Sequence, residues 1–115
     1  MSGTKVRSIY KSEAAFYQRI KRDLASLPGC SFFRVETSTM HGFPDLIILY
    51  NGRAFFLELK NTGNKATAIQ RAIIDMIKRS MGISFVMTPD LWLPFLEKLK
   101  EVPPLLDMDA FCFYP

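Results

Sequence analysis

The chain of 115 residues contains one histidine and two cysteines, which are too few and too widely spaced for a common zinc site or a disulfide framework. Cys30 and Cys112 lie far apart in the sequence and are typical of reduced thiols in a cytosolic protein, so we expect a cytoplasmic location. No run of about 18 or more apolar residues occurs, and we therefore expect no membrane-spanning helix. The polar, basic segment 1–11 has no apolar stretch of the kind that a secretory signal requires.

Other catalytic and binding motifs are missing as well. No glycine-rich loop joins a predicted strand to a predicted helix, which argues against a nucleotide-binding fold. No nucleophile-elbow motif is present, which argues against a serine hydrolase. Apolar residues are plentiful, because 49% of the chain is hydrophobic and 13% is aromatic. The chain can therefore bury a core, and we expect one domain over residues 1–115, with a core of about 8–101 and a tail of 102–115.

Charge is unevenly distributed along the chain. The net charge is +4, and the segments 1–34, 35–50, 51–80 and 81–115 carry +5, −2, +4 and −3. Positive charge therefore flanks a short acidic segment, and the C-terminal segment is acidic. A bound polyanion such as nucleic acid would match this arrangement, but ordinary solvated lysines and arginines would produce it too.

Hydrophobic periodicity predicts helices and strands in the order α-β-β-β-α-β-α. The third strand, the second helix and the fourth strand form a crossover unit, so we expect an α/β fold with a mixed sheet flanked by helices. Asn51-Gly52 predicts a tight hairpin between the second and third strands. The predicted helices span 8–27, 67–81 and 89–100, and the predicted strands span 31–36, 45–50, 53–60 and 83–87.

The first two predicted helices each carry an apolar stripe. Glu13 lies three residues before Phe16, so it shares the inward face of the first helix. A carboxylate on that face needs a partner, because burying an unpaired charge is costly. The stripe of the first helix is Phe16, Ile20, Leu24 and Leu27, and that of the second is Ile69, Ala72, Ile73, Met76 and Ile77.

Two short motifs lie at neighbouring ends of the predicted hairpin strands. Asp45 follows Gly42-Phe43-Pro44 and opens one strand, and Glu58 lies thirteen residues later, just before Lys60, at the end of the other. Side chains alternate along a strand, so the three charged groups should converge. Paired carboxylates hold a hard divalent cation, such a cation activates water and neutralises a phosphate, and an ammonium group stabilises developing negative charge. These residues indicate metal-dependent phosphodiester cleavage.

The arrangement Gly42-x-Pro44-Asp45 followed by Glu58-x-Lys60 resembles the PD-(D/E)xK nuclease superfamily. More narrowly, the chain resembles a stand-alone VRR-Nuc domain, the virus-type replication-repair nuclease module, over roughly residues 8–88. The resemblance implies a restriction-endonuclease-like α-β-β-β-α-β core and a Mg2+- or Mn2+-dependent endodeoxyribonuclease without an organic cofactor. It also implies a homodimer that cuts four-way (Holliday) DNA junctions, and a phage or mobile-element origin, in which case the location is the host cytoplasm.

The resemblance implies a role for each motif residue, and each role has a plain structural alternative. Asp45 and Glu58 would ligate the metal, with the backbone carbonyl of Leu59 as a third ligand. Alternatively, Asp45 caps the turn after Pro44, and Glu58 forms an exposed salt bridge with Lys60, worth about 0–1 kcal/mol. Lys60 would contact the attacking water or the phosphate, or it is a solvated lysine at a strand end.

Two further residues of the implied site come from helices. Glu13 matches a glutamate of the family's first helix and would reach the metal directly or through water. Alternatively, it is a first-turn glutamate that the helix dipole favours. Gln70 matches a glutamine of the following helix and would orient the site or touch DNA, or it completes a capping box with Thr67.

Several positions are candidate DNA contacts, with an ordinary solubilising surface as the alternative. Cationic and aromatic groups ahead of the first helix and near the start of the second could hold phosphates. His41 could contact DNA or carry a proton, or it is a loop histidine without a function. The candidates are Lys5, Arg7, Tyr10, Lys11, His41, Lys65 and Arg71.

The short chain leaves little room for a separate DNA-binding domain, and a dimer would supply the missing surface. The apolar tail around Phe111 and Tyr114 and the helix near Trp92 are candidate dimer contacts, because large apolar side chains need a cover. The alternative for the tail is packing on its own domain. Three other functions stay open: a flap or nicking nuclease of the same fold, a non-catalytic nucleic-acid-binding module, and a protein-interaction module.

Overall fold

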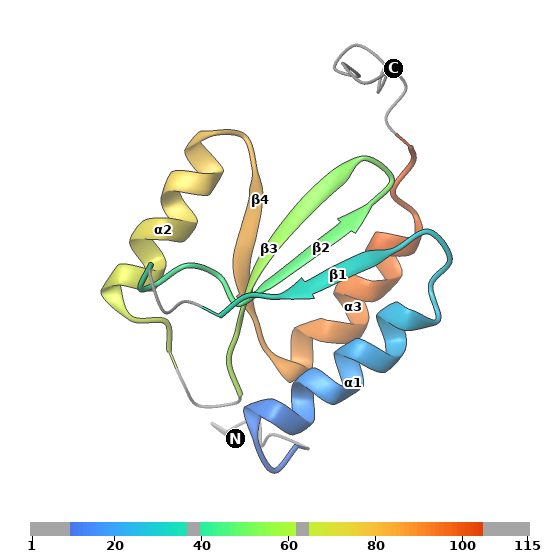
Figure 1. Ribbon diagram of the computed structural model, residues 1–115, viewed down its shortest axis with the longest axis horizontal. Coiled ribbons are helices and arrows are strands. Elements are labelled where there is room, and N and C mark those ends of the chain that lie inside the picture. The colour runs from blue at the N-terminus through green and yellow to red at the C-terminus, as the bar shows by residue number, and fades with distance from the viewer. Residues whose placement is uncertain (1–9, 37–39, 62–64, 105–115) are drawn as a thin grey trace, which may run out of the picture.

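The computed structural model describes residues 10–36, 40–61 and 65–104 (Figure 1). These residues form three helices and four strands in the order α-β-β-β-α-β-α, which confirms the predicted α/β fold class. The predicted tail contacts at 111–114 and the candidate DNA contacts Lys5 and Arg7 lie outside the described residues. The elements are α1 Glu13–Ala25, β1 Ser31–Arg34, β2 Leu46–Tyr50, β3 Arg53–Leu59, α2 Ala68–Arg79, β4 Ile83–Met87 and α3 Pro89–Lys100.

The four strands form one mixed sheet in the order β1-β2-β3-β4. The pairs β1–β2 and β2–β3 are antiparallel, and β3–β4 is parallel because α2 crosses between them. Asn51 and Gly52 have φ values of 52° and 82°, as a tight two-residue hairpin requires. Leu46 pairs with Leu57, so the start of β2 lies beside the end of β3. The register therefore brings the two motifs to one end of the sheet.

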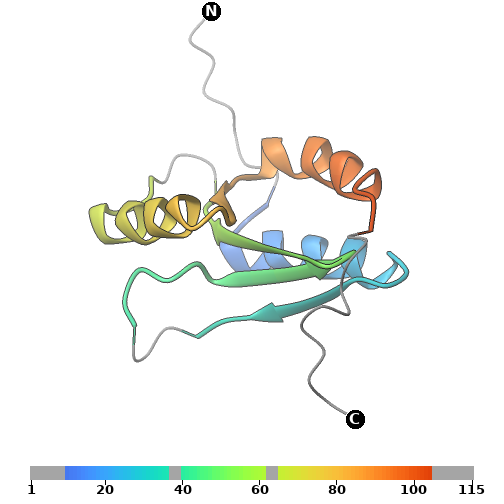
Figure 2. The ribbon, with the colours of Figure 1, turned by 90° about the horizontal axis from the view of Figure 1, so that it is seen from above.

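The core lies between one face of the sheet and the helices α1 and α3, which lie side by side (Figures 1 and 2). Ser12 caps α1, because its hydroxyl accepts a hydrogen bond from the Ala15 N–H at 3.1 Å, so α1 begins later than the predicted start at residue 8. The predicted stripe of α1 is confirmed for its central residues. Buried core residues include Phe16, Ile20, Leu24, Leu46, Ile48, Leu57, Leu59, Trp92, Leu96 and Leu99.

Helix α2 lies apart from the other two helices, alongside β4 (Figure 1). Its predicted apolar stripe is wrong for Ile69, Ala72 and Met76, which are exposed, whereas Ile73 and Ile77 are half-buried and Ile74, outside the stripe, is buried. The helix is turned so that Gln70 and Ile74, one turn apart, face the sheet. Contacts with β3 and β4 therefore decide which side of this helix is buried. Within the described residues, no helix has the length and hydrophobicity needed to cross a membrane.

Candidate metal centre

Three carboxylates from three elements meet at the end of the sheet where β2 begins and β3 ends. Asp45 directly precedes β2, Glu58 lies in β3, and Glu13 is the first residue of α1. One oxygen atom of each carboxylate lies within 4.8 Å of those of the other two. Oxygens on opposite sides of one hard cation are about 4–5 Å apart, given metal–oxygen distances of about 2.0–2.6 Å. The acidic triad therefore has the spacing of a site for one cation.

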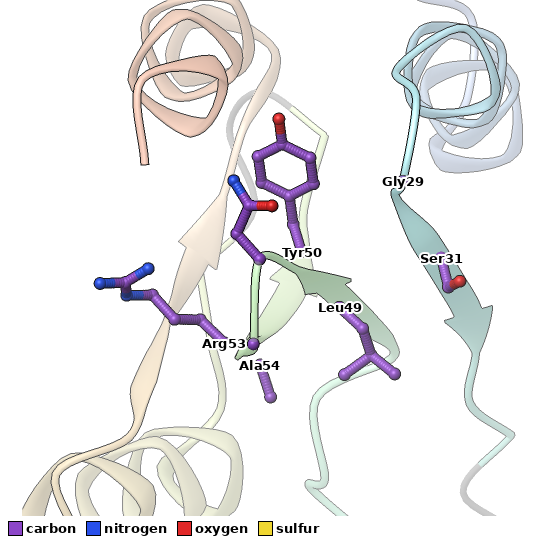
Figure 3. Close-up of a pocket in the computed structure, with 8 residues that line it drawn as sticks. Gly29, Ser31, Leu49, Tyr50, Arg53 and Ala54 are labelled. Carbon is purple, nitrogen blue, oxygen red and sulfur yellow. The ribbon is translucent and has the colours of Figure 1, made fainter. Parts of the chain in front are cut away.

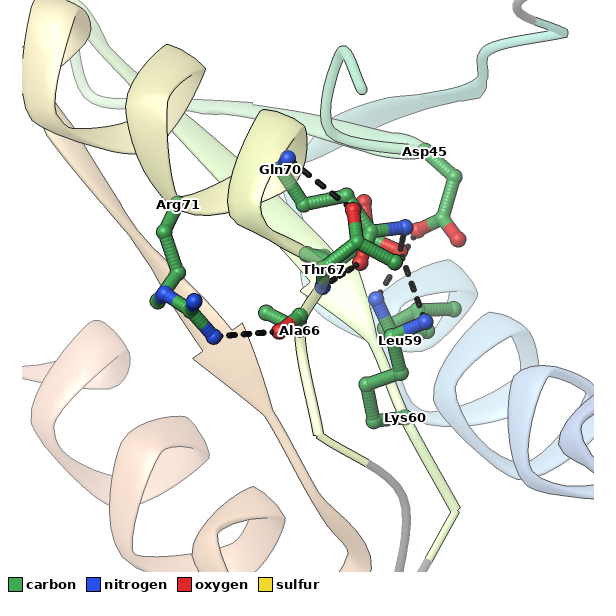
Figure 4. Close-up of polar contacts among 8 residues, drawn as sticks. Asp45, Leu59, Lys60, Ala66, Thr67, Gln70 and Arg71 are labelled. Carbon is green, nitrogen blue, oxygen red and sulfur yellow. Dashed lines mark hydrogen bonds and ion pairs between the residues drawn. The ribbon is translucent and has the colours of Figure 1, made fainter. Parts of the chain in front are cut away.

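Asp45 is positioned by a tight loop and by the neighbouring strand. Gly42 has a φ of +86°, and a side chain there would collide with Ile69 of α2, so this position needs glycine. Oδ1 of Asp45 accepts a hydrogen bond from the Leu59 N–H at 3.0 Å (Figure 4). That bond ties the carboxylate to β3, beyond the local turn at Pro44 that the structural alternative invoked. Leu59 makes this contact through its amide N–H, and the metal-ligand role of its carbonyl stays a prediction.

Glu58 is held by Gln70 and flanked by Lys60. Its Oε2 accepts a hydrogen bond from Nε2 of Gln70 at 3.0 Å, and Nζ of Lys60 lies 3.9 Å from the same oxygen (Figure 4). The Lys60 and Glu58 side chains are only 16% and 5% exposed. The contact is therefore not the exposed strand-face salt bridge that the alternative interpretation describes.

Gln70 takes part in two arrangements at once. Its Oε1 accepts a hydrogen bond from the Thr67 N–H at 2.7 Å, and the Thr67 hydroxyl accepts one from the Gln70 N–H at 3.2 Å. The predicted capping box is thus confirmed. Because the box uses the Oε1 atom of Gln70, the Nε2 atom is left to point at Glu58. The start of α2 is therefore coupled to the acidic triad.

The surroundings of the triad disfavour the ionised form of two of its carboxyl groups, Asp45 and Glu58. Burial, followed by the nearby charge of Asp45, raises the pKa of Glu58 to about 7, although Lys60 opposes the shift. Burial also raises the pKa of Asp45, and the Leu59 N–H opposes it. Neighbouring carboxylates with raised pKa values show that negative charge is held here at a cost. An all-oxygen donor set of this kind fits a hard divalent cation such as Mg2+ or Mn2+.

The candidate DNA contacts within the described residues lie close in sequence to the residues of the site. Tyr10 stacks on Phe16 with a ring-centroid distance of 5.4 Å. Arg71 is exposed and donates a hydrogen bond to the Ala66 carbonyl at 2.6 Å (Figure 4). Three further candidates are exposed, namely Lys11, His41 and Lys65.

Arg34 is a charged neighbour of the triad that the sequence pattern does not reveal. Its guanidinium carbon lies 4.6 Å from the ring centroid of Tyr17 in α1. Its positive charge lowers the pKa of both Asp45 and Glu58, against the larger effect of burial. In the sequence, Arg34 is only the polar member of an alternating strand. Its place follows from the pairing of β1 with β2, and knowledge of that pairing could have indicated it.

A hollow at the opposite end of the sheet offers no comparable chemistry. It surrounds the hairpin turn and has one charged lining residue, Arg53 (Figure 3). The Arg53 guanidinium donates a hydrogen bond to the Pro103 carbonyl, so this group is already engaged. The other lining residues are Gly29, Ser31, Leu49, Tyr50, Asn51, Gly52 and Ala54.

Comparisons of the chain with models of protein families, with curated proteins and with solved structures give no match. The mixed-sheet α/β fold and the acidic triad are therefore what characterise this chain. The triad could hold a metal ion, and membership of a nuclease family stays a prediction.

Proposed function

We propose that this protein is a Mg2+- or Mn2+-dependent endodeoxyribonuclease that hydrolyses phosphodiester bonds. The observation that carries the proposal is the meeting of Glu13, Asp45 and Glu58 within 4.8 Å. The nearby Lys60 supplies the ammonium group that this chemistry uses. The substrate class comes from the motif resemblance to VRR-Nuc domains of the PD-(D/E)xK superfamily.

The three carboxylates would hold the cation, each through one oxygen, and the Leu59 carbonyl would add a further oxygen. A bound divalent cation would supply a water of lowered pKa and positive charge opposite the scissile phosphate. The Leu59 N–H keeps one oxygen of Asp45 oriented, which leaves the other oxygen of that carboxylate for a ligand.

Lys60 and Gln70 have different supporting roles in this proposal. At 3.9 Å from Glu58, Lys60 is too far for a strong hydrogen bond, so its N–H donors can turn to an attacking water or a phosphate oxygen. Gln70 fixes the orientation of Glu58 through Nε2, and the capping box with Thr67 fixes Gln70 in turn. The site is thus supported by the end of a helix instead of a free loop.

We propose that the substrate is a four-way DNA junction and that the working unit is a homodimer. One site cuts one strand, so paired cuts at a two-fold branched substrate call for two sites related by two-fold symmetry. Lys11 lies two residues before Glu13, and Lys65 and Arg71 flank the start of α2, where they can contact phosphates. Trp92 is only 2% exposed, so the large apolar side chains of α3 that a partner can reach are its neighbours Leu91 and Leu93.

The test is cleavage of a synthetic four-way junction, a flap and a linear duplex with Mn2+ or Mg2+. Asp45→Asn removes one carboxylate charge from the triad. Asp75→Asn, at an exposed position in α2, is the matched control. We expect wild type and Asp75→Asn to make paired symmetric cuts in the junction and Asp45→Asn to make none.

The other outcomes separate the alternatives. Cutting of flaps or duplex alone keeps the nuclease and overturns the junction assignment. Binding of DNA without metal-dependent cutting overturns the nuclease and supports a nucleic-acid-binding module. If DNA is neither bound nor cut even in low salt, both interpretations fail and a protein-interaction module is left.

A further inference from the structure

We propose that Arg34 binds a phosphate oxygen of the DNA strand that occupies the acidic site. The inference rests on the proposed nuclease function and adds a substrate-positioning residue to it. It is carried by the place of Arg34 in the sheet, by the contact that holds its side chain and by the N–H donors that this contact leaves free.

The backbone places Arg34 next to the triad. Arg34 pairs with Leu46, the residue after Asp45, and the Val35 N–H donates to the Asp45 carbonyl at 2.8 Å. Strand β2 lies between β1 and β3. Arg34 at the end of β1 and Lys60 just after β3 therefore lie on the two sides of Asp45.

The side chain of Arg34 is held by an aromatic ring. Its guanidinium carbon lies 4.6 Å from the centroid of Tyr17, which is within the range of a cation–π contact. Tyr17 follows Glu13 by four residues, so both lie on one face of α1, one turn apart. The ring thus keeps the positive charge one helical turn from the first carboxylate of the triad.

The N–H donors of Arg34 are unused within the part of the chain that the structure describes. Among the residues that the structure describes, no carboxylate forms an ion pair with Arg34 and no acceptor takes a hydrogen bond from its guanidinium. A cation–π contact occupies the face of the guanidinium and leaves its in-plane N–H groups available. By contrast, three other arginines donate to acceptors of their own chain: Arg19 to Asp23, Arg53 to Pro103 and Arg71 to Ala66.

A phosphodiester needs such a group at this place. Three carboxylates repel the negative charge of the phosphate that has to approach them. An exposed guanidinium beside them offsets that repulsion, and its planar fork can donate two N–H groups to phosphate oxygens. Because the Tyr17 ring already restricts Arg34, less side-chain freedom is lost when phosphate binds.

The experiment compares wild type with Arg34→Ala, Arg34→Lys and Arg79→Ala. Arg79→Ala is the matched control, because it removes one exposed charge nine residues, or about 13 Å of helix, beyond Gln70. Binding of a synthetic four-way junction is measured with Ca2+ over a range of salt concentrations, and cleavage is measured with Mn2+ under single-turnover conditions. Methylphosphonate groups, which carry no charge, then replace the phosphates around the cut one at a time.

We expect Arg34→Ala to weaken junction binding about tenfold and to lower the slope of log affinity against log salt by about 0.9. Arg34→Lys should recover the slope, because the charge returns, while cleaving more slowly than wild type because the planar fork is lost. One methylphosphonate should weaken binding by wild type and leave binding by Arg34→Ala unchanged. A merely structural arginine would not produce that pairing of one residue with one phosphate.

Four results would overturn the inference. An unchanged salt slope in Arg34→Ala means that no phosphate contact was lost. An identical methylphosphonate profile in wild type and Arg34→Ala means that any loss of binding is indirect. If wild type cuts the junction and Arg34→Ala behaves like Arg79→Ala, the nuclease stands and the role of Arg34 fails; if wild type neither binds nor cuts DNA, both proposals fail.

Discussion

Two carboxylates with little exposure, Asp23 in α1 and Glu58 in β3, lie in opposite electrostatic surroundings. Oδ2 of Asp23 accepts hydrogen bonds from Nε of Arg19 at 2.9 Å and from the indole N–H of Trp92 at 2.8 Å. Burial acts to raise the pKa of Asp23, but these two bonds and the charge of Arg19 together lower it below its ordinary value. Among the described residues, only the neutral amide of Gln70 lies at hydrogen-bond distance from the Glu58 carboxylate, and burial and Asp45 raise the pKa of Glu58 to about 7.

The difference distinguishes a carboxylate that serves the fold from carboxylates that need something from outside. Asp23 joins α1 to α3, and its own chain satisfies its charge, as is usual for buried polar groups. The triad of Glu13, Asp45 and Glu58 holds more negative charge than the nearby Lys60 neutralises. Such unbalanced sites are typical of function and not of stability, because a fold gains nothing from repelling charges.

The largest expected effect is on catalysis. Glu58→Gln should lower Mn2+-dependent cleavage of the junction by about 1000-fold or more, because losing a ligand removes several kcal/mol of transition-state stabilisation. Asp23→Asn should cleave at close to the wild-type rate when both proteins are folded. Single-turnover rates on one labelled junction measure both. Similar losses in the two variants would break the comparison between a structural and a functional carboxylate.

Substitution of Asp23 should affect the stability of the fold instead. Asp23→Ala leaves the Trp92 N–H and the Arg19 guanidinium without their acceptor, and we expect a loss of about 2 kcal/mol in the free energy of unfolding. Asp75→Ala, at an exposed position, should change it by less than about 0.5 kcal/mol. Urea denaturation followed by tryptophan fluorescence measures both changes. If Asp23→Ala is as stable as its control, the bridge between α1 and α3 is unimportant.

The two carboxylates also predict opposite pH dependences. Between about pH 4.3, the ordinary pKa of a glutamate in the unfolded chain, and about pH 7, the folded protein keeps a proton on Glu58 that the unfolded chain has released. This contribution to stability is present below about pH 4 and is lost as the pH rises through about 7. The raised pKa of Asp45 acts in the same direction. The lowered pKa of Asp23 has the opposite effect: its contribution to stability is present above the ordinary pKa of an aspartate and is lost as the pH falls through the lowered pKa.

Metal-free wild type should therefore be less stable at about pH 8 than at about pH 5.5, by about 2 kcal/mol. Denaturation with chelator present measures the difference, and Glu58→Gln should make it smaller. Millimolar Mg2+ should recover stability at the higher pH, because the cation binds the deprotonated carboxylates. A profile that stays flat for wild type would show that the triad is not strained by its own charges.

The sequence predicted what local patterns determine. The helical spacing of Phe16, Ile20 and Leu24, and the Asn51-Gly52 turn, are confirmed. The turn fixes the register of β2 and β3, which is why the approach of Asp45 to Glu58 could be predicted from a spacing of thirteen residues.

Contacts between distant segments could not be predicted in this way. Asp23 and Trp92 are 69 residues apart, and nothing near either of them in the sequence indicates their hydrogen bond. Arg34 reaches the triad only through the pairing of β1 with β2. The burial of α2 could not be predicted either, because an apolar stripe does not indicate which segment will cover it, and Ile69 of that stripe is exposed.

The smallest effect we predict concerns Gln70, because a substitution there can give Glu58 surroundings like those of Asp23. Gln70→Lys would give Glu58 a charged donor, as Arg19 gives Asp23. The added charge should lower the pKa of Glu58 and weaken Mn2+ binding about tenfold, because the ammonium group competes with the cation for the same oxygen. Calorimetric titration of the metal-free protein with Mn2+ measures this change.

The control for that substitution is Thr67→Ala, because both changes break the capping box at the start of α2 and should cost about 1 kcal/mol of stability. Only Gln70→Lys also changes the charge beside Glu58. If the two variants bind Mn2+ equally, Glu58 does not face the cation, and the raised pKa of its carboxyl group reflects burial alone. If Gln70→Lys alone is weakened, metal affinity follows the negative charge that the chain leaves unbalanced, which is the property that separates Glu58 from Asp23.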